Sequence, residues 1–281
     1  PPARASLAPM PASDRPRPRP PPRPGPPPGD RAGRAAPPAV WLFGLHAVRD
    51  ACLNPRRTRR RLILTANAAD RLGPETLAAA GLEPEIADAR RFPAPLDPAS
   101  VHQGAALEAE PLDWGPLDAA ARPERPSDLV VLLDRVTDPH NVGAVLRSAE
   151  VFGARAVIAP ARHAAPETGA LAKAASGALE RQPYLRVRNL AEAMETLKDL
   201  GYAVIGLDGE APDPLDDALA AAPRGPLALA LGAEGPGLRA RTRETCDRLA
   251  RIPSAAAFAS LNVSNAAAVA LAAARRARPL A

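Results

Sequence analysis

The stretch that decides the fold is LVVLLDRVTDPHNVGAVLRSAEVFGARAVIA, residues 129–159, in which an apolar strand, a turn, a helix and a second apolar strand follow one another. Asp138 is a suitable N-cap, Pro139 suits the first helical position, and Gly153 is a fitting terminator. The apolar positions of the helix recur at helical spacing: Val142, Val145, Leu146 and Ala149. The stretch therefore predicts a strand–helix–strand unit.

Later apolar runs continue this pattern toward the C-terminus. Residues 202–207 and 227–231 are short, apolar and without polar alternation, and helical segments separate them. A shorter strand is expected at residues 249–254. Strands of this kind are typical of a parallel sheet that is covered on both faces, so the sequence predicts an α/β fold.

Length and composition exclude several classes of protein. The chain has 281 residues, 46% of them apolar and 24% charged, which is enough for one large or two medium domains. No apolar run approaches the roughly 18 residues that cross a bilayer, so no membrane association is expected. Cys52 and Cys246 lie far apart without ligand spacing, so we expect no disulfide framework, no metal site and a cytoplasmic location.

The chain divides by composition into four parts. Residues 1–38 contain fifteen prolines, seven arginines and two aspartates, and are predicted to form an extended, disordered tail. The tail is either an electrostatic tether to RNA or a low-complexity extension. Residues 39–112 predict a small α/β domain, 113–128 a linker and 129–281 the larger α/β domain. The net charge of +5 belongs to the tail, so it is no argument for nucleic-acid binding by the folded part.

Two further segments carry candidate functional residues. The segment LGAEGPGL, residues 231–238, is a strand that runs into a glycine-rich turn with Glu234 at its tip. Its glycines permit a close approach of the backbone to a ligand. The segment SLNVSN, residues 260–265, opens an alanine-rich helix with several polar groups, of which helix capping explains one at most. The remaining polar groups indicate a site.

Arg147 lies off the apolar stripe of the helix that begins at Pro139. Gly143, one turn earlier, leaves space beside it, so the guanidinium could reach an anionic ligand near the carboxyl edge of the sheet. A solvated surface arginine is the alternative interpretation.

The three segments, in this order, resemble the three signature motifs of the SpoU (TrmH-like) branch of the SPOUT methyltransferases. The matching residues are DPHNVGA (138–144) with Arg147, LGAEGPGL (231–238), and Ile252-Pro253 with SLNVS (260–264). The resemblance covers roughly residues 129–276. In addition, GLHAV (44–48) and HQG (102–104) look like the substrate-binding domain of the bacterial 23S rRNA guanosine 2'-O-methyltransferases. The proline-rich tail has no counterpart in this pattern.

The resemblance implies a SPOUT domain with a trefoil knot, preceded by a small L30e-like substrate-binding domain. It also implies S-adenosylmethionine as the cofactor, with contacts at Gly232, Ile252 and Leu261, and a homodimer. The reaction implied is methyl transfer to a ribose 2'-hydroxyl of RNA, for which the family pattern points to a guanosine in the peptidyl-transferase region of 23S rRNA.

The resemblance places five residues in the catalytic centre: Asn141, Arg147, Glu234, Ser260 and Asn262. Because a guanidinium keeps its proton at neutral pH, we favour Arg147 as the group that binds phosphate and stabilises the alkoxide, and leave the proton acceptor open. Glu234 orients Arg147 or accepts a proton. A base role for His140 is the alternative to a simple solvent-facing position.

The arginine cluster between residues 56 and 61 is expected to contact RNA phosphates, given such a substrate. The predicted contacts are Arg56, Arg57, Arg59 and Arg60. With 3% aromatic residues, base stacking is not expected to be the main mode of recognition. Two other functions stay open: a tRNA guanosine 2'-O-methyltransferase, and a catalytically silent RNA-binding or ribosome-assembly factor on the same fold.

Overall fold

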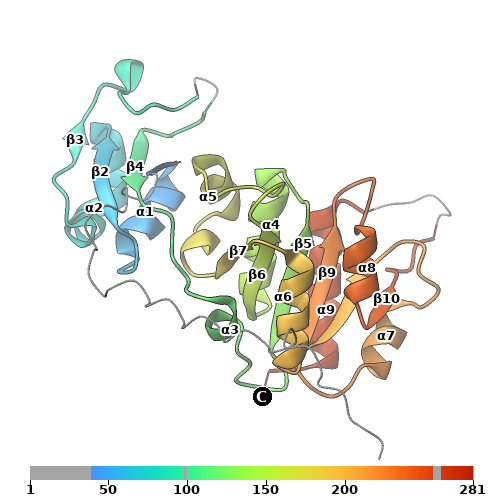
Figure 1. Ribbon diagram of the computed structural model, residues 1–281. Helices are drawn as coiled ribbons and strands as arrows, with labels where there is room; N and C mark the ends of the chain where they lie inside the picture. The colour runs from blue at the N-terminus through green and yellow to red at the C-terminus, as the bar shows by residue number, and fades with distance from the viewer. Residues whose placement is uncertain (1–38, 98–99, 256–260, 281) are drawn as a thin grey trace, which may run out of the picture. The chain divides into compact units, whose positions relative to one another are not determined.

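The computed structural model describes residues 39–97, 100–255 and 261–280 (Figure 1). The predicted tail, residues 1–38, lies outside the described residues. The strand–helix–strand unit is confirmed as β5 (Leu129–Asp134), α4 (Pro139–Val151) and β6 (Ala154–Pro160). Asp138 caps α4, because its carboxylate accepts the His140 N–H at 2.9 Å. Gly153 follows the helix with φ of 64°, as a helix terminator requires.

A six-stranded, wholly parallel sheet forms the larger part of the molecule, which confirms the predicted fold class. Its order is β10-β8-β9-β5-β6-β7. The strands not yet introduced are β7 (Tyr184–Val187), β8 (Ala203–Leu207), β9 (Leu227–Gly232) and β10 (Arg248–Ala250). The chain thus moves outward from β5 to β7, and then returns to place β9 on the other side of β5.

Helices cover both faces of this sheet, as the unalternating strands require. Side chains of β5 and β9 alternate between two apolar clusters. One cluster contains α4, α5 (Gly169–Ala175), α7 (Leu215–Ala221) and α9 (Val263–Ala277). The other contains α6 (Leu190–Asp199), with α8 (Ala240–Thr245) packed against that helix. Both faces of β5 are therefore fully buried.

A second sheet of four strands precedes the large one. Its order is β1-β4-β2-β3, from β1 (Val40–Phe43), β2 (Arg59–Leu64), β3 (Glu85–Ile86) and β4 (Ala105–Ala109). Its helical segments are α1 (Leu45–Leu53), α2 (Ala66–Ala80) and the short 3-10 turn Ala89–Arg91. The two sheets thus fall on either side of the predicted linker, and the domain boundaries themselves stay a prediction.

The segment predicted as a linker contains α3 (Leu117–Ala120) and packs against the large sheet. Ala121 is fully buried, and its carbonyl accepts the Tyr202 hydroxyl at 2.8 Å. Burial raises the pKa of Tyr202, and the Asp128 carboxylate adds to the rise. The segment with linker composition is therefore a connection that is held against the large sheet.

Helices α4 and α5 approach each other at a glycine. A Cβ at Gly143 would lie 2.5 Å from the Ala174 Cβ and 2.8 Å from the Ala175 amide nitrogen. These positions are closer than van der Waals contact, so only glycine permits this packing. Gly143 therefore fixes the distance between α5 and the helix that carries Asn141 and Arg147.

Substitution of this glycine tests the helix packing. Gly143→Ala is expected to lower the free energy of unfolding by about 1–3 kcal/mol, because an added methyl group overpacks the interface. Gly225→Ala is the matched control, since the nearest atom to its Cβ would be 3.9 Å away. Urea denaturation measures both variants. Equal stability of the two variants would contradict the close approach.

Candidate active site

A cavity of about 770 Å³ lies where the carboxyl ends of β8 and β9 meet the start of α9. It is lined by Leu207, Asp208, Gly209, Leu231, Gly232, Ala233, Glu234, Gly235, Gly237, Ile252, Pro253, Ser254, Leu261, Asn262, Val263 and Ala266. The three residues predicted to bind a cofactor are all in this lining. A second hollow, of about 340 Å³, lies by the amino ends of the same strands, and none of the predicted site residues line it. In open parallel sheets ligands bind at the carboxyl edge, which favours the larger cavity.

The glycine-rich turn folds back onto the end of β9. Gly237 donates its N–H to the Ala233 carbonyl at 2.9 Å, and Gly235 has a φ of 84°. A Cβ at Gly232 would collide with the Gly237 carbonyl and the Leu238 amide nitrogen. The loop thus occupies the space that a side chain at Gly232 would need, and it presents backbone groups to the cavity.

A buried carboxylate anchors the far end of this loop. Asp134 has no solvent exposure, and its oxygens accept the Arg239 N–H at 2.9 Å, the Arg239 Nε–H at 2.6 Å and the Thr242 hydroxyl at 2.7 Å. In the sequence, Asp134 is the last residue of the predicted strand that begins at Leu129. A carboxylate directly after a buried apolar run was the signal, because such a group needs partners from a neighbouring segment.

The three sequence segments meet in one polar cluster beside the cavity. Asn141 donates from Nδ2 to Glu234 Oε1 at 3.2 Å. Asn262 donates from Nδ2 to Asn141 Oδ1 at 2.9 Å and to Glu234 Oε1 at 2.5 Å. Glu234 and Asn262 are exposed and Asn141 is half-buried, so an external substrate can reach them. The structure therefore brings together three of the five predicted catalytic residues.

Asn262 also has a structural task. Its Oδ1 accepts the backbone N–H groups of Ser264 and Asn265, at 2.9 and 3.4 Å, and thereby caps α9. One amide side chain thus fixes the start of a helix with its oxygen and holds the cluster with its nitrogen.

Of the other two predicted catalytic residues, Arg147 is described and does not contact this cluster. Arg147 is exposed on α4, and within the residues that the structure describes its guanidinium makes no hydrogen bond or ion pair. Ser260 lies outside the described residues. His140 is exposed at the start of α4, as the solvent-facing interpretation expects.

The structure separates the four arginines predicted to bind RNA. Arg57 is a correction: its side chain is 0% exposed and is paired with Glu167 and Glu180, so it cannot contact an external phosphate. Arg59 donates to backbone carbonyls at the end of α1. The other two, Arg56 and Arg60, are exposed, and their RNA contacts stay a prediction.

One cavity residue was missed by the sequence analysis. Asp208 directly follows β8, lines the cavity and forms an ion pair with Arg243. The signal was an acidic residue and a glycine directly after an apolar strand. Within the described ranges no three His, Cys, Asp or Glu side chains are grouped for a metal ion. No described helix is both long enough and apolar enough to cross a bilayer.

Comparisons with known proteins agree with this geometry. Residues 128–272 match the model of the SpoU rRNA Methylase family. A 23S rRNA (guanosine-2'-O-)-methyltransferase RlmB from Ralstonia nicotianae is 41% identical over 237 residues, which cover 82% of this chain and 92% of the relative. One of the same name from Pseudomonas putida is 39% identical over 82% of this chain and 93% of the relative. The SpoU methyltransferase AviRb from Streptomyces viridochromogenes, solved with AdoMet, has a TM-score of 0.72 and 27% identity, covering 85% of this chain and 90% of that one.

Two substitutions at Asn262 separate its two tasks. Asn262→Ala is expected to cost about 1 kcal/mol of stability at any pH, because α9 loses its cap. Asn262→Asp keeps the capping oxygen but sets a second carboxylate against Glu234, which raises the pKa of that pair. Stability of the Asp variant should therefore equal that of the parent near pH 4 and fall as the pH rises through the raised pKa.

Urea denaturation at pH 4 and pH 7 measures both effects. Asn189→Ala is the matched control for the loss of a cap, since Asn189 caps α6 far from the site in sequence. An Asp variant whose stability deficit does not change with pH would contradict the contact between Asn262 and Glu234.

Proposed function

The chain belongs to the SpoU rRNA methylase family, and from this premise we propose that it methylates the ribose 2'-hydroxyl of a guanosine in 23S rRNA. It is an S-adenosylmethionine-dependent RNA methyltransferase. The peptidyl-transferase region is the proposed location of the guanosine. The observation that carries the proposal is the hydrogen-bonded cluster of Asn141, Glu234 and Asn262, because it unites all three family segments beside one cavity.

The cavity fits the cofactor in size and in the chemistry of its lining. Its volume of about 770 Å³ lies within the range of small-molecule sites. Leu207, Leu231 and Ile252 provide apolar surface for an adenine ring, and the backbone around Gly232 provides hydrogen-bonding groups. When bound, S-adenosylmethionine supplies the methyl group from its sulfonium centre. We assign Gly232, Ile252 and Leu261 to its binding.

Glu234 is placed to act on the substrate hydroxyl. Its Oε1 already accepts two amide N–H groups, which fix the orientation of the carboxylate. Among the described residues no partner contacts its second oxygen, so Oε2 is available to accept a hydrogen bond from a ribose hydroxyl. The amides of Asn141 and Asn262 thus hold a charged acceptor in position before the RNA arrives.

Arg147 is assigned to the RNA phosphate and to the developing alkoxide. Its guanidinium is exposed and has no partner among the described residues, so it is available to an anion. A guanidinium is a rigid, permanently charged donor, which suits charge stabilisation better than proton abstraction. Ser260, in the third segment, is proposed to help fix the ribose.

The remaining parts of the proposal concern assembly. We propose a trefoil knot formed by the C-terminal segment, supported by the insertion of β9 between β8 and β5 and by the return of α9 to pack on β9 and α4. We also propose a homodimer and a cytoplasmic location, which the resemblance to this family implies. Sedimentation of the purified chain at two concentrations tests the dimer.

The substrate is tested by methyl transfer from labelled S-adenosylmethionine to undermethylated 23S rRNA and, separately, to tRNA. We expect label on a single guanosine of 23S rRNA, mapped as a 2'-O-methyl group. Label on tRNA alone would identify a tRNA guanosine 2'-O-methyltransferase instead. Label on neither, together with no cofactor binding, would identify a silent RNA-binding or ribosome-assembly factor.

Arg147→Ala tests the role of the guanidinium. We expect methyl transfer to fall by at least about a hundredfold, because a charge-stabilising donor is removed. RNA binding, measured by filter retention, should weaken by much less, since one phosphate contact among several is lost. Unchanged methyl transfer would contradict the assignment of Arg147 to the catalytic centre.

Gly232→Ala tests the cofactor cavity. The added methyl group would displace the loop at Gly237 and Leu238, so we expect cofactor affinity to fall at least about tenfold in a calorimetric titration. Gly225→Ala, where a side chain has room, serves again as the control. Normal affinity of the Gly232 variant would show that the loop does not form the binding site.

A further inference from the structure

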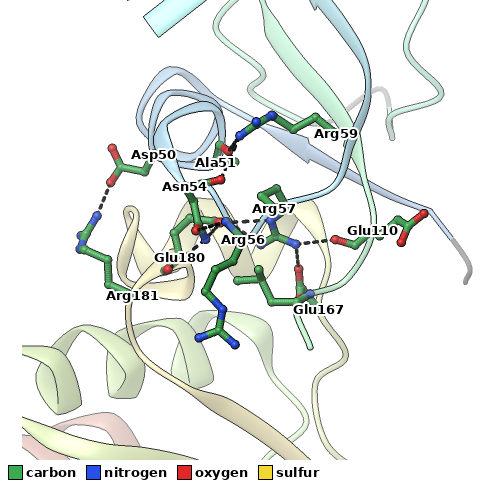
Figure 2. Close-up of polar contacts among 11 residues, drawn as sticks. Asp50, Ala51, Asn54, Arg56, Arg57, Arg59, Glu110, Glu167, Glu180 and Arg181 are labelled. Atoms are coloured by element: carbon green, nitrogen blue, oxygen red, sulfur yellow. Dashed lines mark hydrogen bonds and ion pairs between the residues drawn. The ribbon is translucent and has the colours of Figure 1, made fainter. Parts of the chain in front are cut away.

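Arg57 occupies a buried ionic cluster that the reaction itself does not use. It lies between α1 and β2, beside Glu167 and Glu180 (Figure 2). Its side chain is 0% exposed. Its Nη2 and Nε atoms donate to the two carboxylate oxygens of Glu180, at 2.5 and 3.1 Å. Its Nη1 atom donates to the Glu167 carboxylate and to the Glu110 carbonyl, the latter at 2.7 Å. One guanidinium is therefore shared between two carboxylates.

The two carboxylates belong to the part of the chain that also carries the proposed catalytic residues. Glu167 lies just before α5, and Glu180 belongs to the 3-10 turn η2 (Ala178–Glu180) that follows it. Both accept further hydrogen bonds from the N-terminal side. Asn54 donates to Glu180 Oε2 at 2.9 Å, and the Leu112 N–H donates to Glu167 Oε2 at 3.1 Å. The cluster thus fastens the segment around α5 to the loop that precedes β2.

Burial of these charged side chains carries a desolvation cost. Desolvation raises the pKa of the Glu167 carboxyl, while the Arg57 guanidinium and the Leu112 N–H oppose that rise. A buried ion pair is a weak source of stability, because the cost of desolvation offsets the attraction. A bidentate guanidinium–carboxylate pair does, however, impose one geometry. The main effect of the cluster is therefore to fix the position of the segment around α5 relative to the loop that precedes β2.

Tight packing and a second ion pair surround the cluster. A Cβ at Gly169 would collide with the Phe43 ring, and one at Gly177 with the Asp50 carboxylate. At the rim, Arg181 donates to Asp50 of α1 at 2.8 Å and also pairs with Glu150 of α4. Glycine at two positions allows the N-terminal part to lie directly against the segment around α5.

The same segment packs on the helix of the reaction centre. Helix α5 meets α4 at Gly143, two residues beyond Asn141 and one turn before Arg147. A continuous path of contacts therefore runs from Arg57 through Glu167, Glu180 and α5 to the helix that carries two residues of the proposed centre.

We propose that Arg57 is a positioning residue, which holds the sheet of residues 40–109 at a fixed distance from the Asn141–Glu234–Asn262 cluster and so determines which ribose of a bound RNA is methylated. This inference rests on the proposed function. Orienting two sites on one substrate accelerates a reaction by proximity, and a displacement of about 1 Å is enough to lose much of the rate. Arg57 contacts neither RNA nor cofactor, and acts through Glu167 and Glu180.

The test compares Arg57→Lys with Arg61→Lys. Lysine at position 57 keeps the charge but cannot form the bidentate pair. Arg61→Lys is the matched control, because Arg61 forms an exposed ion pair with Glu85, each side chain being 44% exposed. We expect Arg57→Lys to bind S-adenosylmethionine within twofold of the parent. Its kcat/KM for 23S rRNA should fall at least tenfold, and methyl groups should appear on riboses next to the normal position. Arg61→Lys should match the parent in all three.

Hydrogen exchange gives a readout that needs no RNA. Faster exchange in β1 and α5 of the Arg57 variant, and not in the control, is expected if the cluster holds the two parts together. A parent that methylates no RNA would overturn the proposed function, whereas unchanged exchange in the Arg57 variant would overturn this inference. Methylation at one position with normal kcat/KM would overturn it as well, as would a parallel loss of cofactor affinity and activity.

A milder pair of variants applies if Arg57→Lys does not fold. Arg181→Gln removes the rim contacts of a side chain that is half exposed, and Arg181→Lys retains the charge. We expect methylation at neighbouring riboses and a reduced kcat/KM in the glutamine variant, with recovery in the lysine variant. Identical behaviour of both variants and the parent would overturn the inference.

Discussion

The parallel pairing of β5 with β9 brings together the first two segments of the site. The two strands run in register over six residues, and the last pair places Asp134 opposite Gly232. From Gly232 the chain reaches Glu234 after two residues, and from Asp134 it reaches the start of α4 and Asn141 after one short turn. Because parallel strands end at the same edge, one pairing brings together segments that lie almost a hundred residues apart.

Helix α9 completes this edge by using one residue twice. Four backbone N–H groups at the start of a helix lack partners within it, so a capping side chain is needed there. Asn262 meets that need with its oxygen and has an N–H left for Glu234. The position of the helix and the orientation of the carboxylate are therefore coupled. This coupling explains why several polar groups stand before an alanine-rich helix that otherwise requires only close packing.

The sequence could predict the features of this structure that depend on neighbouring residues, such as strand bounds and helix caps. The bounds of β5, the cap at Asp138 and the start of α4 follow from apolar runs, capping residues and proline, and all agree with the structure. The grouping of Asn141, Glu234 and Asn262 follows from the resemblance of three ordered motifs to a known family, which implies that these residues share one centre. The partners of Arg57 were not predictable, since Glu167 and Glu180 are more than a hundred residues away. Asp208 directly follows an apolar strand, but the sequence does not show that this strand end borders the cavity.

The arginines between residues 56 and 61 show why charge pattern alone does not assign a role. Arg61 pairs with Glu85 in water, where solvent screening leaves such a pair with little net energy. Arg57, four residues earlier, is buried, and there the loss of either partner leaves an uncompensated charge that is costly in a medium of low dielectric constant. Arg61 can therefore be replaced at little cost in stability, whereas the fold requires an arginine at position 57. Burial, which only the folded chain defines, therefore separates Arg57, which holds the architecture, from the solvent-exposed Arg61.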